Sequence, residues 1–348
     1  MLAILLATWI GLAQPPTEPC RLGAEAYQNK DYNSAEKLLH ECLAQHPEEL
    51  GPYLTLCAFY QSLNRKDDLY KIASKGLQSF PEEKRFYLTV GVGAGRREDY
   101  DRAIEVLEEG QIRWPEEGKF QQNLAQAYLS RGMLHLDEGE NESAEFDLRK
   151  TLELDPENVD AMINLGRSLH NMQNSGQALD LFDRAKVLRP GTPQIEFNRG
   201  VALSGLGRFD EVISAMNRQL LVTPDNPSCF YFRGLAFLNR GEWDKARADL
   251  TLAVEGMPDF HEAIYRLGRC YLHFGQLEKA EAAFRRSMAL EPSDVRSIYA
   301  LGRVLQQSGR VEEAKAMFKK AENQYIRDEL ESGGIKFGST EGDLEVKK

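Results

Sequence analysis

Hydrophobic and small residues recur along this chain with a fixed period. Residues 261–294 show the repeating unit best, in the order Ile264, Leu267, Gly268, Tyr271, Ala280, Phe284 and Pro292. The second, third and fourth of these lie three, four and seven residues after Ile264, which places them on one face of an α-helix. Ala280 and Phe284 are four apart and mark a second helix. The pattern therefore predicts two amphipathic helices in each unit.

The prolines carry the same period. Eight of them are separated by steps of 34 residues, apart from one step of 41: Pro47, Pro81, Pro115, Pro156, Pro190, Pro224, Pro258 and Pro292. Proline lacks an N–H donor and clashes with the preceding turn, so each one is expected to end a second helix. Two ladders of mostly small residues run in register, one from Gly23 through Ala125 to Gly302 and one from Ala35 to Ala314. They predict helices that cross closely in a hairpin.

This order and spacing resemble the tetratricopeptide-repeat (TPR) family, whose 34-residue pattern is W-x2-L-G-x2-Y…A-x3-F…P. The resemblance implies an all-α fold, a right-handed superhelical solenoid of antiparallel helix-turn-helix repeats. It spans residues 16–328 in nine contiguous units: 16–49, 50–83, 84–117, 118–158, 159–192, 193–226, 227–260, 261–294 and 295–328. No unit has the tryptophan of the family pattern at its fourth position.

The fourth and the last units depart from the common length. The fourth has seven extra residues, which we place within Arg131–Glu138 and expect to add about one turn to each helix. They form either a longer hairpin, packed by Met133, Leu134 and Leu136, or a prong that docks a partner. The last unit has Ile326 in place of proline, so its second helix is expected to continue to about Glu331.

The two ends of the chain have compositions unlike the repeats. Residues 1–13 are uncharged and almost wholly apolar, and Gly11 and Ala13 form a small-x-small pair. This pattern predicts a signal peptide cleaved before Gln14, and hence export to the periplasm or the extracellular space with no membrane association after cleavage. The alternative is a capping helix on a cytoplasmic protein. Residues 332–348 are rich in glycine and charge and are expected to be disordered.

The five cysteines are too few for a disulfide scaffold of this size. Cys20 and Cys42 fall near the start of the first helix and the end of the second helix of one hairpin. Antiparallel packing brings those levels together, so an exported chain can form a disulfide there. Alternatively, Cys57 packs against Cys42. Cys229 and Cys270 have the pattern of small core residues.

Charge and motifs exclude several functions. The formal net charge of −11 argues against generic affinity for nucleic acid or anionic lipid. The chain has no catalytic motif of the common hydrolase, metalloprotease or phosphate-loop kinds, and its six histidines have no metal-ligand spacing. The cluster Gly91-x-Gly93-x-Gly95 lies on a predicted helix and indicates close packing. We therefore expect no catalytic activity, no cofactor and no metal site.

The TPR resemblance implies that positions 2, 5, 6, 9, 12 and 13 of each unit face a concave groove. Nine basic residues occupy these positions: Arg21, Arg85, Arg96, Lys119, Arg167, Arg266, Arg269, Arg296 and Arg303. Only Asp160 and Glu262 are acidic there, so the groove carries +7 and the rest of the chain −18. This segregation favours an acidic ligand in the groove.

Two further groups of residues mark the predicted groove. Asn123, Asn164 and Asn198 occupy position 6 of three successive units. They resemble the asparagine ladder of the TPR superhelix in O-linked N-acetylglucosamine transferases, which implies peptide holding; the alternative is surface asparagine on a polar face. Five aromatic residues accompany the arginines, and one or two of them are expected in the core: Phe197, Tyr231, Phe232, Tyr265 and Tyr299.

Together these features predict a non-catalytic protein-binding module that holds an extended, net-acidic segment in its groove. The alternative is an assembly scaffold or adaptor in a cell-envelope complex, which binds partners through its convex face, its edges or the insertion in the fourth unit.

Overall fold

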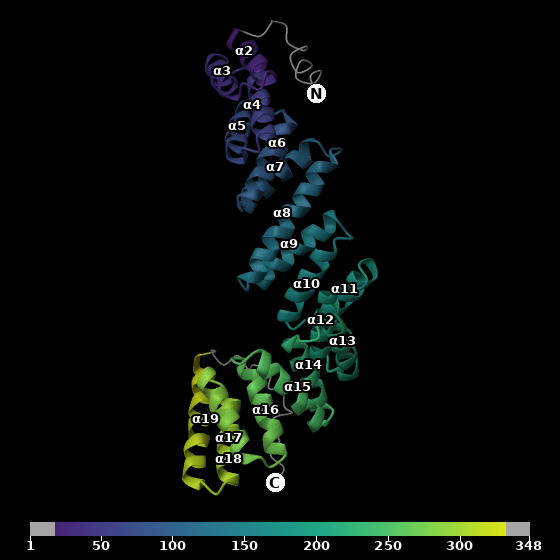
Figure 1. Ribbon diagram of the computed structural model, residues 1–348, viewed down its shortest axis with the longest axis vertical. Coiled ribbons are helices and arrows are strands. Elements are labelled where there is room, and N and C mark those ends of the chain that lie inside the picture. Colours follow the sequence, from purple (N-terminus) through teal and green to yellow (C-terminus); the bar gives the residue numbers. More distant parts are fainter. Residues whose placement is uncertain (1–17, 332–348) are drawn as a thin grey trace. The chain divides into compact units, whose positions relative to one another are not determined.

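The structure is a computed structural model that describes residues 18–331, and every regular element in this range is an α-helix (Figure 1). The predicted signal peptide at 1–13 and the predicted tail at 332–348 lie outside the described residues. The sequence boundary between two compact units falls between Met172 and Gln173. We refer to them as the first unit and the second unit.

The first unit contains helices α2 to α10. Their bounds are α2 Glu18–Gln28, α3 Tyr32–Gln45, α4 Leu50–Ser62, α5 Lys66–Ser79, α6 Lys84–Arg96, α7 Tyr100–Arg113, α8 Gly118–Asp137, α9 Asn141–Leu154 and α10 Val159–Asn171. The second unit contains helices α11 to α19. Their bounds are α11 Ser175–Leu188, α12 Pro193–Gly205, α13 Phe209–Val222, α14 Pro227–Asn239, α15 Trp243–Gly256, α16 His261–His273, α17 Leu277–Leu290, α18 Val295–Gln307 and α19 Val311–Glu331.

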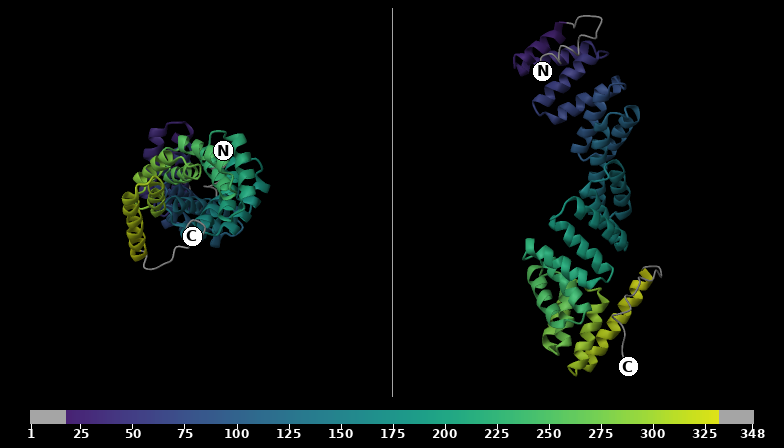
Figure 2. Two further views of the ribbon diagram at one scale, coloured as in Figure 1. Left: turned by 90° about the horizontal axis from the view of Figure 1, so that it is seen from below. Right: turned by 90° about the vertical axis from the view of Figure 1, so that its right-hand side faces the viewer.

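Short connections join successive helices, and each helix packs on its neighbours within a unit. In Figure 2 the last helices of the second unit, α16 to α19, lie side by side as antiparallel hairpins. The predicted all-α solenoid of helix-turn-helix repeats is therefore confirmed. The prolines act as expected, since α17 ends at Leu290, two residues before Pro292.

Small residues allow the two helices of a hairpin to cross closely. A Cβ atom added at Gly268 would lie 2.7 Å from Cε1 of Phe284, and one at Gly302 would lie 2.6 Å from Cε1 of Phe318. Such distances are below van der Waals contact, so a larger side chain would separate the helices. The last helix, α19, ends at Glu331 as expected.

The prediction that the seven extra residues lengthen both helices of the fourth repeat is wrong. Helix α8 has 20 residues against 13 for α10 and α16, while α9 has the 14 residues of α11 and α17. All of the extra length is in the first helix. Seven residues make about two turns, so the helix keeps the same face toward its neighbours at both ends.

The predicted place of the insertion, within Arg131–Glu138, is also wrong. A Cβ atom at Gly132 would lie 2.9 Å from Cγ of Leu148, which is sixteen residues later in the sequence. Gly234 faces Leu250, which is also sixteen residues later. Gly132, and not Ala125, therefore occupies the close-crossing position. At the other end of the helix, Phe120 packs against Gly110 of the preceding repeat. The two extra turns thus lie between Phe120 and Gly132.

The turn that follows α8 confirms this register. Gly139 has a φ of 82°, and it follows Gly132 by seven residues just as Gly241, with a φ of 74°, follows Gly234. A left-handed backbone at this position favours glycine. At the end of α8, Leu136 is buried, whereas Met133 and Leu134 are exposed. Of the three residues expected to pack the longer hairpin, only Leu136 is buried.

Within residues 18–331, no helix is both long enough and apolar enough to cross a membrane.

Candidate protein-binding site

The second unit contains a cavity of 740 Å³ whose wall is mainly aromatic and aliphatic. Helices α16, α18 and α19 provide most of the wall, and the first residue of α15 completes one side. The residues that line it include Trp243, Tyr265, Arg269, Tyr299, Arg303 and Tyr325. We call this space the C-terminal cavity.

The cavity is built from a motif that repeats in two successive units. Tyr265 and Arg269 lie four residues apart on α16, so they share one helix face. Tyr299 and Arg303 occupy the same positions on α18, 34 residues later. Neighbouring helices therefore present an aromatic ring followed by a guanidinium group. The structure brings these four predicted residues together around one space.

The aromatic wall is supported from behind by the second helices. The ring of Tyr265 lies 5.8 Å from the ring of Phe284, and the ring of Tyr299 lies 5.2 Å from that of Phe318. On the far side, Trp243 stacks on His273 with ring centroids 4.0 Å apart. Such contacts fix ring orientation, so the wall is largely organised before a ligand arrives.

Ion pairs divide the groove arginines into two groups. Arg296 pairs with Glu262 at 2.6 Å and with Asp294 at 2.8 Å, and Arg266 pairs with the same Glu262 at 3.0 Å. By contrast, Arg303 forms no ion pair with any residue between 18 and 331. The charge available to a ligand is therefore smaller than the sequence count of +7 suggests. Within the second unit, this available charge is concentrated at the Arg303 side of the cavity.

Pairing with nearby glutamates also neutralises two groove arginines in the first unit. Arg21 pairs with Glu25 at 2.5 Å, and Arg85 pairs with Glu83 at 2.7 Å. Neither glutamate is at a groove position, so the groove charge of +7 does not include these two carboxylates.

Three wall residues were missed from the sequence. Trp243 and Phe318 belong to second helices, and Tyr325 lies near the end of the long helix α19. The groove rule considers first helices only. The sequence feature that could have indicated Tyr325 is Ile326, which stands where the other units have proline. Without proline at that position, α19 continues far enough to bring Tyr325 to the cavity.

The other predicted aromatic residues form a separate cluster. The ring of Phe232 lies 5.8 Å from Phe197 and 5.1 Å from Tyr231, and Tyr231 lies 4.7 Å from Phe260. Tyr231 is only 8% exposed, and burial raises the pKa of its hydroxyl to about 12. Tyr231 therefore serves the core, as expected for one or two of this group, and none of the cluster lines the C-terminal cavity.

The predicted asparagines differ in their surroundings. The side-chain amides of Asn123 and Asn164 donate to the carbonyls of Lys119 and Asp160 in their own helices, at 2.7 and 2.9 Å. Arg167 donates to Oδ1 of Asn164 at 3.0 Å. The Nδ2 atom of Asn198 is buried, with no hydrogen-bond partner in the described part of the chain. The three amides therefore differ in how their donors are satisfied, and they do not form a uniform ladder.

Cys20 and Cys42 are joined by a disulfide, with their Cα atoms 4.9 Å apart. It links the start of α2 to the end of α3, the two levels that antiparallel packing brings together. Cys57 is a free thiol, and burial raises its pKa to about 12. Cys229 and Cys270 are fully buried, in agreement with their core pattern.

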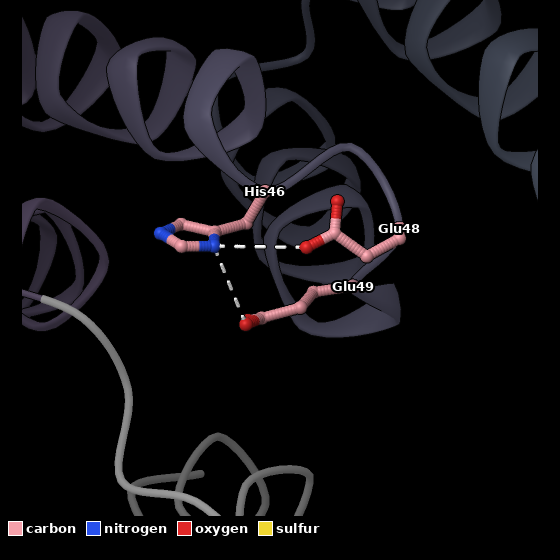
Figure 3. Close-up of side chains that lie close together, drawn as sticks. All are labelled: His46, Glu48 and Glu49. Atoms are coloured by element: carbon pink, nitrogen blue, oxygen red, sulfur yellow. Dashed lines mark ion pairs between the residues drawn. The ribbon is translucent and has the colours of Figure 1, made fainter.

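Two clusters of ligating side chains appear that the sequence spacing did not predict: His46, Glu48 and Glu49, and His135, Glu138 and Glu140. His46, Glu48 and Glu49 lie together at the α3–α4 connection, with Nδ1 of His46 3.8 Å from Glu48 and 3.6 Å from Glu49 (Figure 3). Within the described residues, no further histidine, cysteine or carboxylate joins this group. Its geometry is that of a surface ion-pair cluster.

Comparison with known proteins gives the family. The tetratricopeptide-repeat family matches residues 129–193, 237–296 and 295–323. Among solved structures, the Cut9–Hcn1 complex of the APC/C is similar over 90% of this chain and 59% of the matched chain, with 16% identity and a TM-score of 0.54. PilW, a type IV pilus biogenesis factor, is similar over 60% of this chain and 98% of its own, with 19% identity and a TM-score of 0.53.

PilF of Pseudomonas aeruginosa is similar over 61% of this chain and 99% of its own, with 17% identity and a TM-score of 0.51. At these identities the likeness shows the fold alone. No curated protein sequence matches the chain significantly. Three family matches on a stack of close-crossing hairpins show that the chain contains tetratricopeptide repeats, which support a role in protein–protein interaction or scaffolding.

Proposed function

We propose that the second unit binds an extended, net-acidic segment of a partner protein in the C-terminal cavity, without catalysis. The observation that carries this proposal is the repeated Tyr–Arg pair: Tyr265 with Arg269, and Tyr299 with Arg303, line one space of 740 Å³. Aromatic anchors flanked by arginine are typical of the residues that dominate binding energy in protein interfaces.

The two kinds of wall residue select different parts of the ligand. The rings of Tyr265, Tyr299 and Trp243 offer apolar area to a large side chain. Arg303, which is unpaired within residues 18–331, offers a planar fork of donors to a carboxylate. A segment with an aromatic or large aliphatic residue next to acidic residues fits both requirements, and a basic segment is repelled.

A matched pair of peptides tests this specificity. We expect a peptide that alternates glutamate with phenylalanine to bind the full chain, and the same peptide with lysine in place of glutamate to bind at least about 10-fold more weakly. Isothermal titration calorimetry measures both affinities. Rising salt should weaken binding of the acidic peptide, because screening reduces the attraction to the arginines. Equal affinity for the two peptides would contradict the proposal.

The scaffold alternative places partners on the convex face, the edges or the insertion. Met133 and Leu134 are exposed at the end of α8, just after the two extra turns, and they favour this end of the lengthened helix as such a surface. The affinity for a partner bound there would not change when the acidic peptide occupies the C-terminal cavity, so the peptide would not compete with that partner.

We also infer that the chain is exported. The disulfide between Cys20 and Cys42 supports this inference, because disulfides persist in oxidising compartments and are rare in the cytoplasm. N-terminal sequencing of the protein isolated from its host is expected to begin at Gln14. A mature protein that still begins at Met1 would contradict cleavage.

A further inference from the structure

The first unit contains a second cavity, of 440 Å³, that the proposed function does not use. Helices α5 and α6 form its walls, and α8 contributes Lys119 and Asn123 from its first turns. We call it the N-terminal cavity. The glycines flagged in the sequence shape it, because a Cβ atom at Gly93 would lie 2.6 Å from Cδ2 of Tyr70. Glycine at this position lets the Tyr70 ring lie against α6.

The N-terminal cavity collects positive charge. Lys66, Arg96, Arg97 and Lys119 line it, and Asp67 is the only acidic residue in the lining. Arg97 is neutralised by an ion pair with Asp67 and lies over the Tyr70 ring at 5.1 Å. Three cations are therefore left without an ion-pair partner in the described chain: Lys66, Arg96 and Lys119.

Arg96 differs from most arginines of this unit, because it has no ion-pair partner among the described residues. The unit's other arginines are mostly satisfied within the protein, as Arg65 is by Glu36 at 2.5 Å and Arg113 by Glu109 at 2.8 Å. Like charges held together without partners repel one another, so the arrangement costs free energy until an anion arrives. A bound polyanion removes that cost.

The rest of the lining restricts the class of anion. Leu69, Leu88 and Val92 give the cavity an apolar side beside the three cations. A free inorganic anion would leave this side unused, and a single carboxylate would balance only one charge of three. An apolar side chain flanked by several carboxylates uses both sides. We propose that the N-terminal cavity is a second docking site, which binds an acidic protein segment with one aliphatic residue among its carboxylates.

This site is separate from the C-terminal cavity. We therefore test it in a variant whose C-terminal cavity is expected to bind acidic peptides only weakly. The probe is a labelled peptide of four glutamates around one leucine, titrated by fluorescence anisotropy into the full chain carrying Arg269→Glu and Arg303→Glu. Adding Lys66→Glu, Arg96→Glu and Lys119→Glu is expected to weaken binding at least about 30-fold and to flatten its dependence on salt. These three side chains are exposed, so the fold should tolerate the changes.

The matched control is Lys75→Glu, an exposed lysine on α5 that does not line the cavity, which should change affinity less than about twofold. Thermal unfolding followed by circular dichroism verifies that each variant is folded. Replacing the leucine of the probe by serine should weaken binding several-fold. Unchanged affinity in the triple variant would overturn the proposal, and so would tighter binding of pyrophosphate than of the peptide, since that would identify a phosphoryl site.

Discussion

Replacing Asp147 with alanine is expected to lower the free energy of unfolding by about 3 kcal/mol. Asp147 is 1% exposed, and its two oxygens accept from Nε and Nη2 of Arg131 at 2.8 and 2.7 Å. The variant would leave the Arg131 guanidinium, itself largely buried, without its main partner. Removing one member of a buried pair strands an uncompensated charge, which is more costly than the pair itself is stabilising.

Two controls separate this effect from a simple loss of charge. Asp101 also accepts from Arg131, at 2.6 Å, but it is 86% exposed, so Asp101→Ala should cost less than about 1 kcal/mol. The double variant Arg131→Met with Asp147→Leu should recover most of the stability, because no charge is left buried. Urea unfolding measures all three variants. A similar cost for Asp101 and Asp147 would contradict the account of a buried pair.

Reversing two charges in the C-terminal cavity is expected to weaken binding of the glutamate–phenylalanine peptide about 100-fold, or ~3 kcal/mol. Arg269 and Arg303 occupy the same position of successive repeats and line the same wall. In the variant Arg269→Glu with Arg303→Glu, two carboxylates replace two guanidinium donors, so repulsion is added to the loss of charge-assisted hydrogen bonds. Calorimetry measures the affinity.

The control makes the same change in net charge at residues that do not line the cavity. Lys315 and Lys319 are exposed on α19 and do not line it. The variant Lys315→Glu with Lys319→Glu should lower affinity less than about threefold, through long-range electrostatics alone. If both double variants weaken binding equally, the arginines act only through net charge and the site is elsewhere.

The sequence was sufficient to predict the hairpins and to place four residues of the proposed site around one space, because a repeat fixes both. A residue at one position of a 34-residue unit has the same neighbours in every unit, so the tyrosine–arginine pairs of α16 and α18 could be placed on one face. The same logic identified Cys20 and Cys42 as neighbours. The pairing of Arg296 with Glu262 also follows the period, since the two are 34 residues apart.

What the sequence did not predict depends on details that the period does not encode. The insertion was misplaced because Ala125 is small enough to satisfy the ladder, although the spacing of Gly132 and Gly139 matches that of Gly234 and Gly241. Two residue pairs carried the same information: Arg131 precedes Asp147 by sixteen residues, as Arg233 precedes its buried partner Asp249. Side-chain partners outside the groove positions, such as Glu83 for Arg85, were missed because only groove positions were counted.

The central claim is that the acidic segment enters the C-terminal cavity, and Trp243 reports on that cavity directly. Its indole lines the wall and stacks on His273 at 4.0 Å. The decisive measurement is the tryptophan emission of the full chain during titration with the glutamate–phenylalanine peptide, repeated in a Trp243→Phe variant. We predict a saturable change in emission that is absent from the variant and follows the affinity found by calorimetry. Binding without any change that depends on Trp243 would contradict the account.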